Sequence, residues 1–382
     1  MSIVILSDVC KINMGQSPPS SSYNSVAEGL PFFQGNADFG DLHPTVRVWT
    51  TNPIKIAQTD DVLISVRAPI GALNISTEKC CIGRGLAALT PDNRKIKTAF
   101  LFYYLRARQD FLNQQGSGAI FKAVTKTILG DLQINLPSLE RQREIVRVLD
   151  KVEAVIDKHK RQLAKLDELA KARFVEMFGD GSSYPYKWDV ADLSSLFKEF
   201  CSGECLVGEQ REILPGEYAV LKVSAVTRGE FQPRECKVLP QNTEIRKGVF
   251  PRKGDMLMSR ANTRELLGAT ALVDRDYPNL ILPDKIWRIT CRYVETTIFL
   301  KYLLSSPLMR QEISSKATGT SGSMFNISME KLKKMRVITP PLPLQRQFAE
   351  FVTHIERMKG KVRASLEATQ KLLGSLMQEY FS

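Results

Sequence analysis

The chain has 382 residues, of which 43% are hydrophobic and 25% are charged, so it can form about two or three soluble domains. No stretch approaches the ~18 apolar residues of a membrane span, and the apolar run at residues 3–6 ends at Asp8, before a signal-peptide core could form. We therefore expect a cytoplasmic protein without a membrane partner. The net charge of +12 favours a negatively charged partner, most simply nucleic acid, because lysine and arginine displace counterions from phosphates.

Metal-binding and catalytic motifs are missing from the sequence. The seven cysteines include no CxxC pair, and with three histidines they give no zinc-type spacing, so we expect reduced thiols. There is no GxxxxGK[ST] phosphate loop and no Asn-Pro-Pro-aromatic or Asp-Pro-Pro-aromatic tetrapeptide of the amino-methyltransferases. The Pro-Asp pairs at 91–92 and 283–284 lack the acidic-x-lysine triplet that completes a nuclease motif. The expectation is a chain that is not an enzyme and holds no metal or cofactor.

Residues 1–136 form the first predicted block. Residues 61–68 are typical of a half-buried strand entered from a turn, residues 100–105 suit a helix, and residues 117–121 form a small-residue loop that leads into an aromatic.

Residues 137–179 predict one long helix. Pro137 stands just before the helix proper, where proline is tolerated, and Gly179 follows as a C-cap. At about 1.5 Å per residue, the part from residue 142 to 178 spans roughly 55 Å. A seam with alternating steps of four and three residues is typical of a coiled coil, and its positions are Ile145, Leu149, Val152, Ile156, His159, Leu163, Leu166 and Ala170.

Residues 180–340 form a second predicted block that repeats the first. The strand signal returns at residues 255–261, the helix at 298–303 and the small-residue loop at 321–325. Because these segments recur in the same order before a second helix, we infer an internal repeat in which each copy has its own core.

Residues 341–382 predict the second long helix, with Pro343 just before it. Its seam is displaced by a constant 203 residues from the first and consists of Phe348, Val352, Ile355, Lys359, Val362, Leu366, Thr369, Leu373, Leu376 and Tyr380. Lys359 at a core position beside Gly360 predicts a local weak point without a break, since glycine costs about 1 kcal/mol relative to alanine. Two interpretations stay open: a coiled coil, or two amphipathic helices that each pack on their own block.

The expected fold class is therefore α+β, with two similar mixed α/β blocks, two long helices and an internal pseudo-repeat. Two blocks about one turn of B-DNA apart, ~34 Å, could read two short sequences with an unread spacer.

Basic and amide side chains in turns and strand ends are candidates for DNA contact. Arginine can donate two hydrogen bonds to guanine, and asparagine or glutamine can bond adenine twice. The candidates for base contact are Gln34, Arg67, Arg84, Arg260, Asn262 and Arg264. Lys122, Lys126 and Lys285 are candidates for phosphate contact, which positions a protein without specifying sequence. Arg252 and Arg288 belong to the same basic segments. For any single residue, a solvated surface charge is an equally good interpretation.

Several of these segments together resemble the specificity subunit of a Type I restriction-modification enzyme, over essentially the full chain. The resemblance rests on residues 61–68, 116–126, 136–146 and 174–180, on the phrase Val-Leu-Ile-Ser-Val-Arg-Ala-Pro-Ile-Gly at 62–71, and on the recurring Pro-x-Leu-x-x-Gln helix starts. The second block departs from it, since Val-Arg-Ala-Pro-Ile-Gly becomes Ser-Arg-Ala-Asn-Thr at 259–263.

The resemblance implies two target-recognition domains, 1–136 and 180–340, separated by an antiparallel coiled coil of the helices 137–179 and 341–382. Each domain would read one half of a split site in double-stranded DNA. Methylation and cleavage would belong to partners: modification subunits, expected as two copies, that bind S-adenosylmethionine, and restriction subunits that use ATP and Mg²⁺. The outer faces of the helices would carry the modification subunits, with Leu169, Phe174 and Met177 as candidate contacts or, equally, as core caps.

Two other functions fit the same repeat: a stand-alone DNA-binding protein with two heads, or a coiled-coil scaffold whose charge is incidental.

Overall fold

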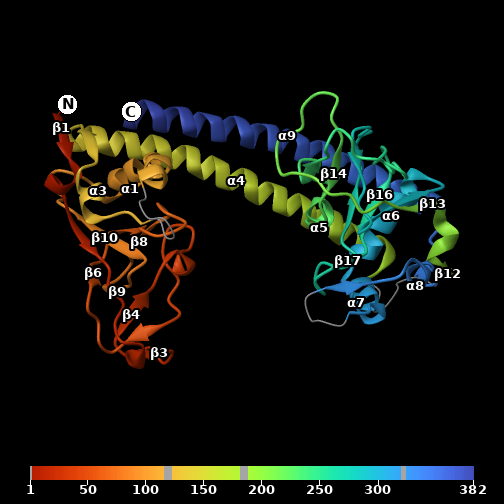
Figure 1. Ribbon diagram of the computed structural model, residues 1–382, viewed down its shortest axis with the longest axis horizontal. Helices are drawn as coiled ribbons and strands as arrows, with labels where there is room; N and C mark the ends of the chain where they lie inside the picture. Colours follow the sequence, from red (N-terminus) through yellow and green to blue (C-terminus); the bar gives the residue numbers. More distant parts are fainter. Residues whose placement is uncertain (1, 116–122, 181–187, 320–323) are drawn as a thin grey trace. The chain divides into compact units, whose positions relative to one another are not determined.

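The computed structural model describes residues 2–115, 123–180, 188–319 and 324–382 (Figure 1). It divides into two compact units, Met1–Arg161 with Arg363–Ser382, and Gln162–Val362. Both long helices contribute residues to both units. Among the described residues, no helix is long and apolar enough to cross a membrane.

The first unit is mainly β-structure. Its strands are β1 (Ser2–Ile5), β2 (Cys10–Met14), β3 (Tyr23–Asn24), β4 (Leu30–Phe33), β5 (Trp49–Thr50), β6 (Ile56–Ala57), β7 (Val62–Ser65), β8 (Leu73–Ile75), β9 (Cys80–Ile82), β10 (Leu86–Pro91) and β11 (Gln133–Leu136). Strands β2-β10-β7-β8 form an antiparallel sheet, β3-β5-β4-β9-β6 form a second sheet in which β4 and β9 are parallel, and β1 pairs with β11. Helices α1 (Thr98–Ala107), α2 (Gln109–Gln115) and α3 (Lys126–Gly130) complete the block.

The second unit repeats this plan. Its strands are β12 (Val190–Asp192), β13 (Phe197–Ser202), β14 (Ala219–Leu221), β15 (Cys236–Val238), β16 (Met256–Ser259), β17 (Ala261–Asn262), β18 (Thr270–Leu272), β19 (Leu280–Ile281), β20 (Ile286–Cys291), β21 (Phe325–Asn326) and β22 (Arg336–Ile338). Its helices are α5 (Ser224–Thr227), α6 (Val294–Ser305), α7 (Pro307–Lys316) and α8 (Met329–Lys333).

The two blocks share their strand order. The antiparallel sheet β13-β20-β16-β18 corresponds to β2-β10-β7-β8, the parallel pair β14 and β19 corresponds to β4 and β9, and the pair β12 and β22 corresponds to β1 and β11. The predicted internal repeat is thus present in the pairing of the strands, and helices α1 and α6 cover the predicted helical segments.

Strands β7 and β16 are buried on both faces, whereas the sequence predicted half-buried strands. Val62 and Ile64 face one core and Leu63 faces another. Met256 and Met258 likewise lie in a different core from Leu257. The prediction was wrong because each strand is an interior strand with a core on either side, which favours a continuous apolar run.

The long helices are α4 (Leu139–Phe178) and α9 (Leu342–Phe381), and both their starts and their ends lie 203 residues apart. Every seam position predicted from the sequence is buried or half-buried. Gly179 takes a left-handed conformation with φ of 91° and donates to the Val175 carbonyl, which confirms the C-cap.

The structure corrects one prediction about α9 and agrees with another. Pro343 lies inside the first turn of α9 and not before the helix. Proline is tolerated there because N–H groups of the first turn have no intrahelical acceptor. The helix continues without interruption through Lys359 and Gly360, as expected of a position without a break.

Each unit holds part of both helices in its core. In the first unit, Ile145 and Leu149 of α4 share a core with Phe381, the last residue of α9, whose ring lies 5.3 Å from that of Phe100. In the second unit, Phe178, the last residue of α4, lies 5.6 Å from Phe348 near the start of α9. Within each unit, the beginning of one long helix therefore packs with the end of the other.

Candidate nucleic-acid interface

A buried glutamine anchors the start of each long helix to its own block. Gln142 accepts from the Lys97 N–H and donates to the carbonyls of Lys95 and Pro137. Gln345 accepts from the Thr296 hydroxyl and donates to the Pro340 carbonyl. Each glutamine is the final residue of its Pro-x-Leu-x-x-Gln motif. The hydrogen bonds of its side chain explain why the motif recurs, because they join each helix to the block before it.

Loops at one edge of the first block bring three of its predicted DNA contacts together. The N–H of Gly85 donates to the Gln34 carbonyl at 3.3 Å, and the N–H of Val66 donates to the Gly85 carbonyl at 2.9 Å. Gln34, Arg84 and Arg67 are therefore on adjacent loop segments, and all three are exposed.

Lys126 lies close to the same loops. The N–H of Val124 donates to the Val66 carbonyl at 2.9 Å, and Thr125 caps α3 by accepting from the Ile128 N–H. Lys126 is the first residue of α3 and is exposed. Four predicted contacts of the first block are thus gathered on one edge. Lys122 lies outside the described residues, as do the glycine loops at 116–118 and 321–322.

The second block builds the same framework from other side chains. The N–H of Arg260 donates to the Lys285 carbonyl at 3.0 Å, and the N–H of Ile327 donates to the Arg260 carbonyl at 3.1 Å. Ser328 caps α8 as Thr125 caps α3. Arg260, Asn262, Arg264 and Lys285 are therefore brought together as well.

The backbone bonds fix which residues of the two blocks correspond. Ser65 accepts from Gly71 and donates to the Ala72 carbonyl, while Ser259 accepts from Gly268 and donates to the Ala269 carbonyl. Arg260 then occupies the place of Val66, and the counterpart of Arg67 is Ala261. Matching the phrase at 66–71 to residues 259–263 is wrong by one position, because it aligns the Arg-Ala letters that both segments contain, whereas the backbone bonds align Ser65 with Ser259.

The predicted contacts of the second block differ in exposure. Arg264 is exposed, and its guanidinium lies 5.5 Å from the centre of the Phe325 ring. Asn262 is half-buried and accepts from the Thr263 N–H. Arg260 lies 6.0 Å from the Trp287 ring, and its buried Nε has no hydrogen-bond partner among the described residues.

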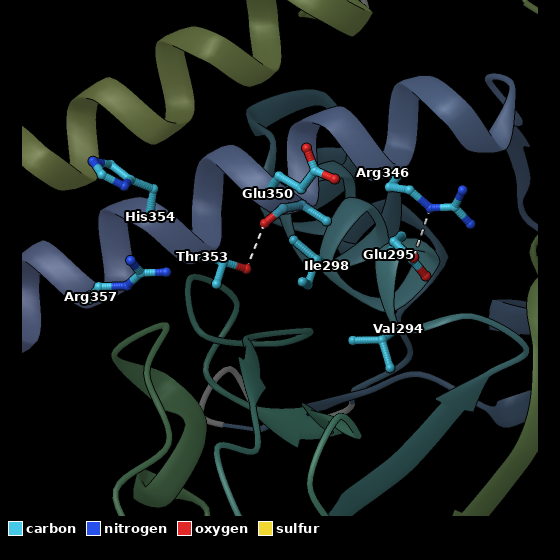
Figure 2. Close-up of a pocket in the computed structure, with 9 residues that line it drawn as sticks. Val294, Glu295, Ile298, Arg346, Glu350, Thr353, His354 and Arg357 are labelled. Atoms are coloured by element: carbon cyan, nitrogen blue, oxygen red, sulfur yellow. Dashed lines mark hydrogen bonds and ion pairs between the residues drawn. The ribbon is translucent and has the colours of Figure 1, made fainter.

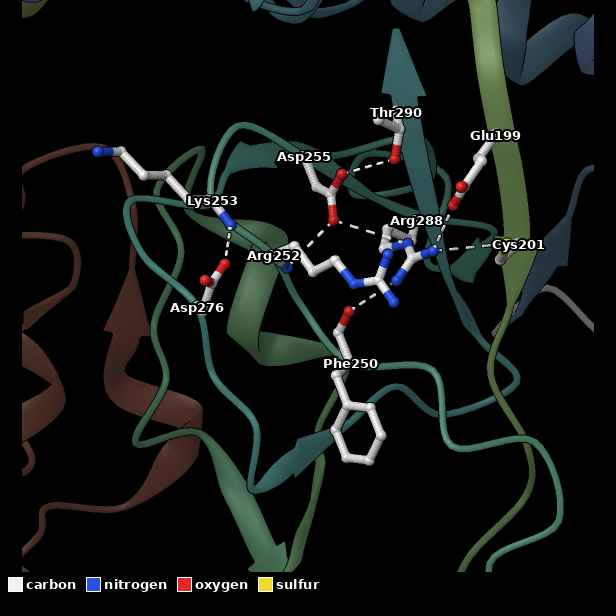
Figure 3. Close-up of polar contacts among 9 residues, drawn as sticks. All are labelled: Glu199, Cys201, Phe250, Arg252, Lys253, Asp255, Asp276, Arg288 and Thr290. Carbon is white, nitrogen blue, oxygen red and sulfur yellow. Dashed lines mark hydrogen bonds and ion pairs between the residues drawn. The ribbon is translucent and has the colours of Figure 1, made fainter.

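Arg288 does not belong to the exposed basic set (Figure 3). It is 5% exposed, donates to Glu199 at 2.7 Å and to the Phe250 carbonyl at 3.0 Å, and its Nε lies 3.6 Å from Asp255. Burial raises the pKa of Asp255, and the hydrogen bond from Thr290 and the charge of Arg288 oppose that rise. Arg288 therefore forms buried ion pairs that stabilise the sheet β13-β20-β16-β18 of the second unit.

Two grooves lie at equivalent places where a long helix passes its block. In the second unit a groove of about 470 Å³ lies between α6 and α9 (Figure 2), with His354 and Arg357 on its wall and an Arg346–Glu295 ion pair of 3.2 Å. In the first unit a groove of about 520 Å³ lies along α4. Arg143, the counterpart of Arg346 at the 203-residue offset, lines that groove with Arg147 and Lys151.

Among the candidate partner contacts, Phe174 is 3% exposed and packs against Phe178, Phe299 and Phe348. It is a core residue and not a surface contact. Met177 is partly buried against the same core, while Leu169 is 49% exposed. In the part of the chain that the structure describes, no group of three or more His, Cys, Asp or Glu side chains could hold a metal ion.

Comparison with known proteins finds related sequences. Residues 1–168 match a family model described as the Type I restriction modification DNA specificity domain. The chain is also 23% identical to the Type I restriction enzyme MjaVIII specificity subunit of Methanocaldococcus jannaschii, over 98% of this chain and 91% of that one. The chain is therefore similar to Type I restriction enzyme specificity subunits over nearly its full length, and residues 1–168 match their DNA specificity domain. The resemblance drawn from the sequence is confirmed.

Two further matches show how far this family likeness extends. A putative MjaX specificity subunit of Methanocaldococcus jannaschii is 44% identical over 161 residues, which are 42% of this chain and 38% of that relative. The chain thus spans less than two thirds of that specificity subunit. The crystal structure of the Type I restriction-modification S subunit from M. genitalium aligns with 100% of this chain, with a TM-score of 0.57 and 12% identity. That specificity subunit shares the mixed α/β fold over the whole chain.

Proposed function

We propose that the chain is the DNA-reading subunit of a Type I restriction-modification complex. Each block reads one half of a split site in double-stranded DNA, and the paired helices α4 and α9 set the spacer as an antiparallel coiled coil. One observation carries the proposal: the same backbone framework occurs twice, and it presents different polar side chains in each block. A framework that is kept while its exposed residues vary is what two readers of different sequences require.

Catalysis belongs to partners in this proposal. The chain contributes no cofactor, whereas modification subunits bind S-adenosylmethionine and restriction subunits use ATP and Mg²⁺ in the cytoplasm. Two equivalent grooves, one along each long helix, support two modification subunits as the stoichiometry. Leu169 remains a candidate contact for them.

The test is a methylome of cells that carry the modification subunit, with and without this chain. We expect a split motif that depends on the chain and that supplies both half-sites and the spacer. If no motif depends on the chain, although the modification subunit is active with another specificity chain, the proposal fails.

A further inference from the structure

Lys359 ties three elements of the second unit together. Its side chain is 3% exposed although it stands on the seam of α9. The ammonium donates to Asp167 of α4 at 2.7 Å, to Glu230 of the second block at 2.7 Å and to Glu356 one turn earlier in α9 at 3.0 Å. An ammonium has three donors, so these three carboxylates satisfy it fully.

The charges make this arrangement stable for a buried cation. Burial alone lowers the pKa of Lys359, but the bonds with Asp167, Glu230 and Glu356 outweigh burial and raise it. The carboxylates are between 41% and 48% exposed, so water solvates their outer oxygens. A single charged residue on a coiled-coil seam is known to fix how helices pair, at a cost in stability.

Glu230 extends the tie to the sheet that carries the candidate base contacts. It lies between α5 and β15, a few residues after Ala225 and Val226 of α5. Those two residues share a core with Leu257 of β16, and Arg260 follows that strand directly. The short chain segment from Val226 to Glu230 and the core of α5 and β16 therefore join the seam of α9 to the edge that carries Arg260, Asn262, Arg264 and Lys285, here called the recognition edge of the second block.

The first unit is built differently at the equivalent position, as far as the structure describes it. At the 203-residue offset, the position of Lys359 is taken by Ile156, which is 7% exposed and apolar. There, α1 is joined to α4 by the Tyr103 hydroxyl, which donates to Asp150 at 2.8 Å and to Glu153 at 3.0 Å, and by an ion pair between Arg106 and Glu153 on the helix surfaces. Among the described residues, a buried lysine on the seam therefore occurs in the second unit and is replaced by an apolar residue in the first.

We propose that Lys359 is a positioning residue for DNA recognition: through Glu230 it holds the second block at one place on the helices and so fixes the number of base pairs between the two half-sites. This inference rests on the proposed function. The tie acts on spacing and not on base identity, because none of its four residues belongs to the recognition edge.

The test is competition binding by the full chain with its modification partner. The duplexes carry the two half-sites of the wild-type motif, with the native spacer or with one base pair more or fewer. We expect Glu230→Ala to reduce the preference for the native spacer about tenfold, the effect of losing one charge-assisted hydrogen bond. The half-sites themselves should not change. Glu230→Gln, which keeps an acceptor without the charge, should fall between Glu230→Ala and the wild type.

The matched control is Glu330→Ala. It removes a Lys–Glu contact of the same 2.7 Å length, with Lys334, but this contact joins α8 only to its own C-cap residue. Hydrogen exchange of residues 224–238 supplies a readout without DNA and should rise in Glu230→Ala but not in Glu330→Ala.

The outcomes separate the two proposals. A wild-type complex without any split motif overturns the proposed function and this inference with it. A wild-type complex with a strict spacer that Glu230→Ala leaves unchanged overturns this inference alone, as does an equal loss of preference in Glu330→Ala.

Discussion

Single residues divide into those that can face DNA and those that hold the blocks together. Exposure and hydrogen bonding separate them, whereas residue type does not. Arg67 and Arg288 are both arginines of a basic segment, yet the first is exposed and the second is a buried ion-pair partner.

Arg67→Ala should weaken recognition of one half-site only. If Arg67 donates to a base, its loss costs about 1–3 kcal/mol in discrimination at one position of that half. Binding to duplexes with every single substitution in both half-sites measures this. A uniform loss over all duplexes would show instead that Arg67 contacts phosphate.

Arg288→Ala should destabilise the second unit strongly. It leaves Asp255 buried without its cation, and breaking a buried pair costs about 3–5 kcal/mol. Denaturant unfolding measures the loss, and Arg336→Ala is the control, because its pair with Asp192 is exposed and should be worth less than about 1 kcal/mol. Equal losses in both variants would contradict the structural role of Arg288.

The thiols should differ in reactivity with a thiol reagent at neutral pH. Burial raises the pKa of Cys10 to about 12. It is also the main cause that raises the pKa of Cys80 and of Cys291 to about 11. The folded chain therefore holds less of the reactive thiolate at these three sites. Cys205 is exposed and should react first. Labelling followed by mass spectrometry tests this, and fast labelling of Cys10 in the folded chain would contradict the burial.

At the scale of elements, the helices were far easier to predict than the strands. Seam spacing placed both long helices and their offset correctly, because a period of alternating steps extends over many residues. Of the strands, only those at 61–68 and 255–261 were predicted from the sequence. The short strands of the sheet around β4 and β9 have no periodic pattern of apolar residues. The equivalence of Arg260 with Val66 could not be predicted, since it depends on backbone bonds between distant loops. Lys359 was recognised as anomalous, but its partner Glu230 lies 129 residues away.

Inserting one heptad at equivalent places in both α4 and α9 should lengthen the spacer. Seven residues add about 10 Å, which corresponds to roughly three base pairs of B-DNA. The half-sites should stay the same, as a methylome of the variant would show. A heptad in α4 alone would put the two proposed seams out of register and serves as the control. An unchanged spacer with both insertions would contradict the role of the helices.

At the scale of the whole molecule, the repeat defines what can be exchanged. The blocks share their strand order and their glutamine anchors, while the side chains at the recognition edges differ. Specificity should therefore reside in the blocks, and spacing in the helices together with the tie at Lys359.

The most direct measurement is the methylome of a chimera. Residues 180–339, between the end of α4 and the start of α9, are replaced by the second block of a specificity subunit that reads a different site. We predict that one half of the motif stays as in the wild-type chain and that the other becomes the donor's half. A motif in which both halves change, or neither does, from a chimera that folds and supports methylation would contradict the account.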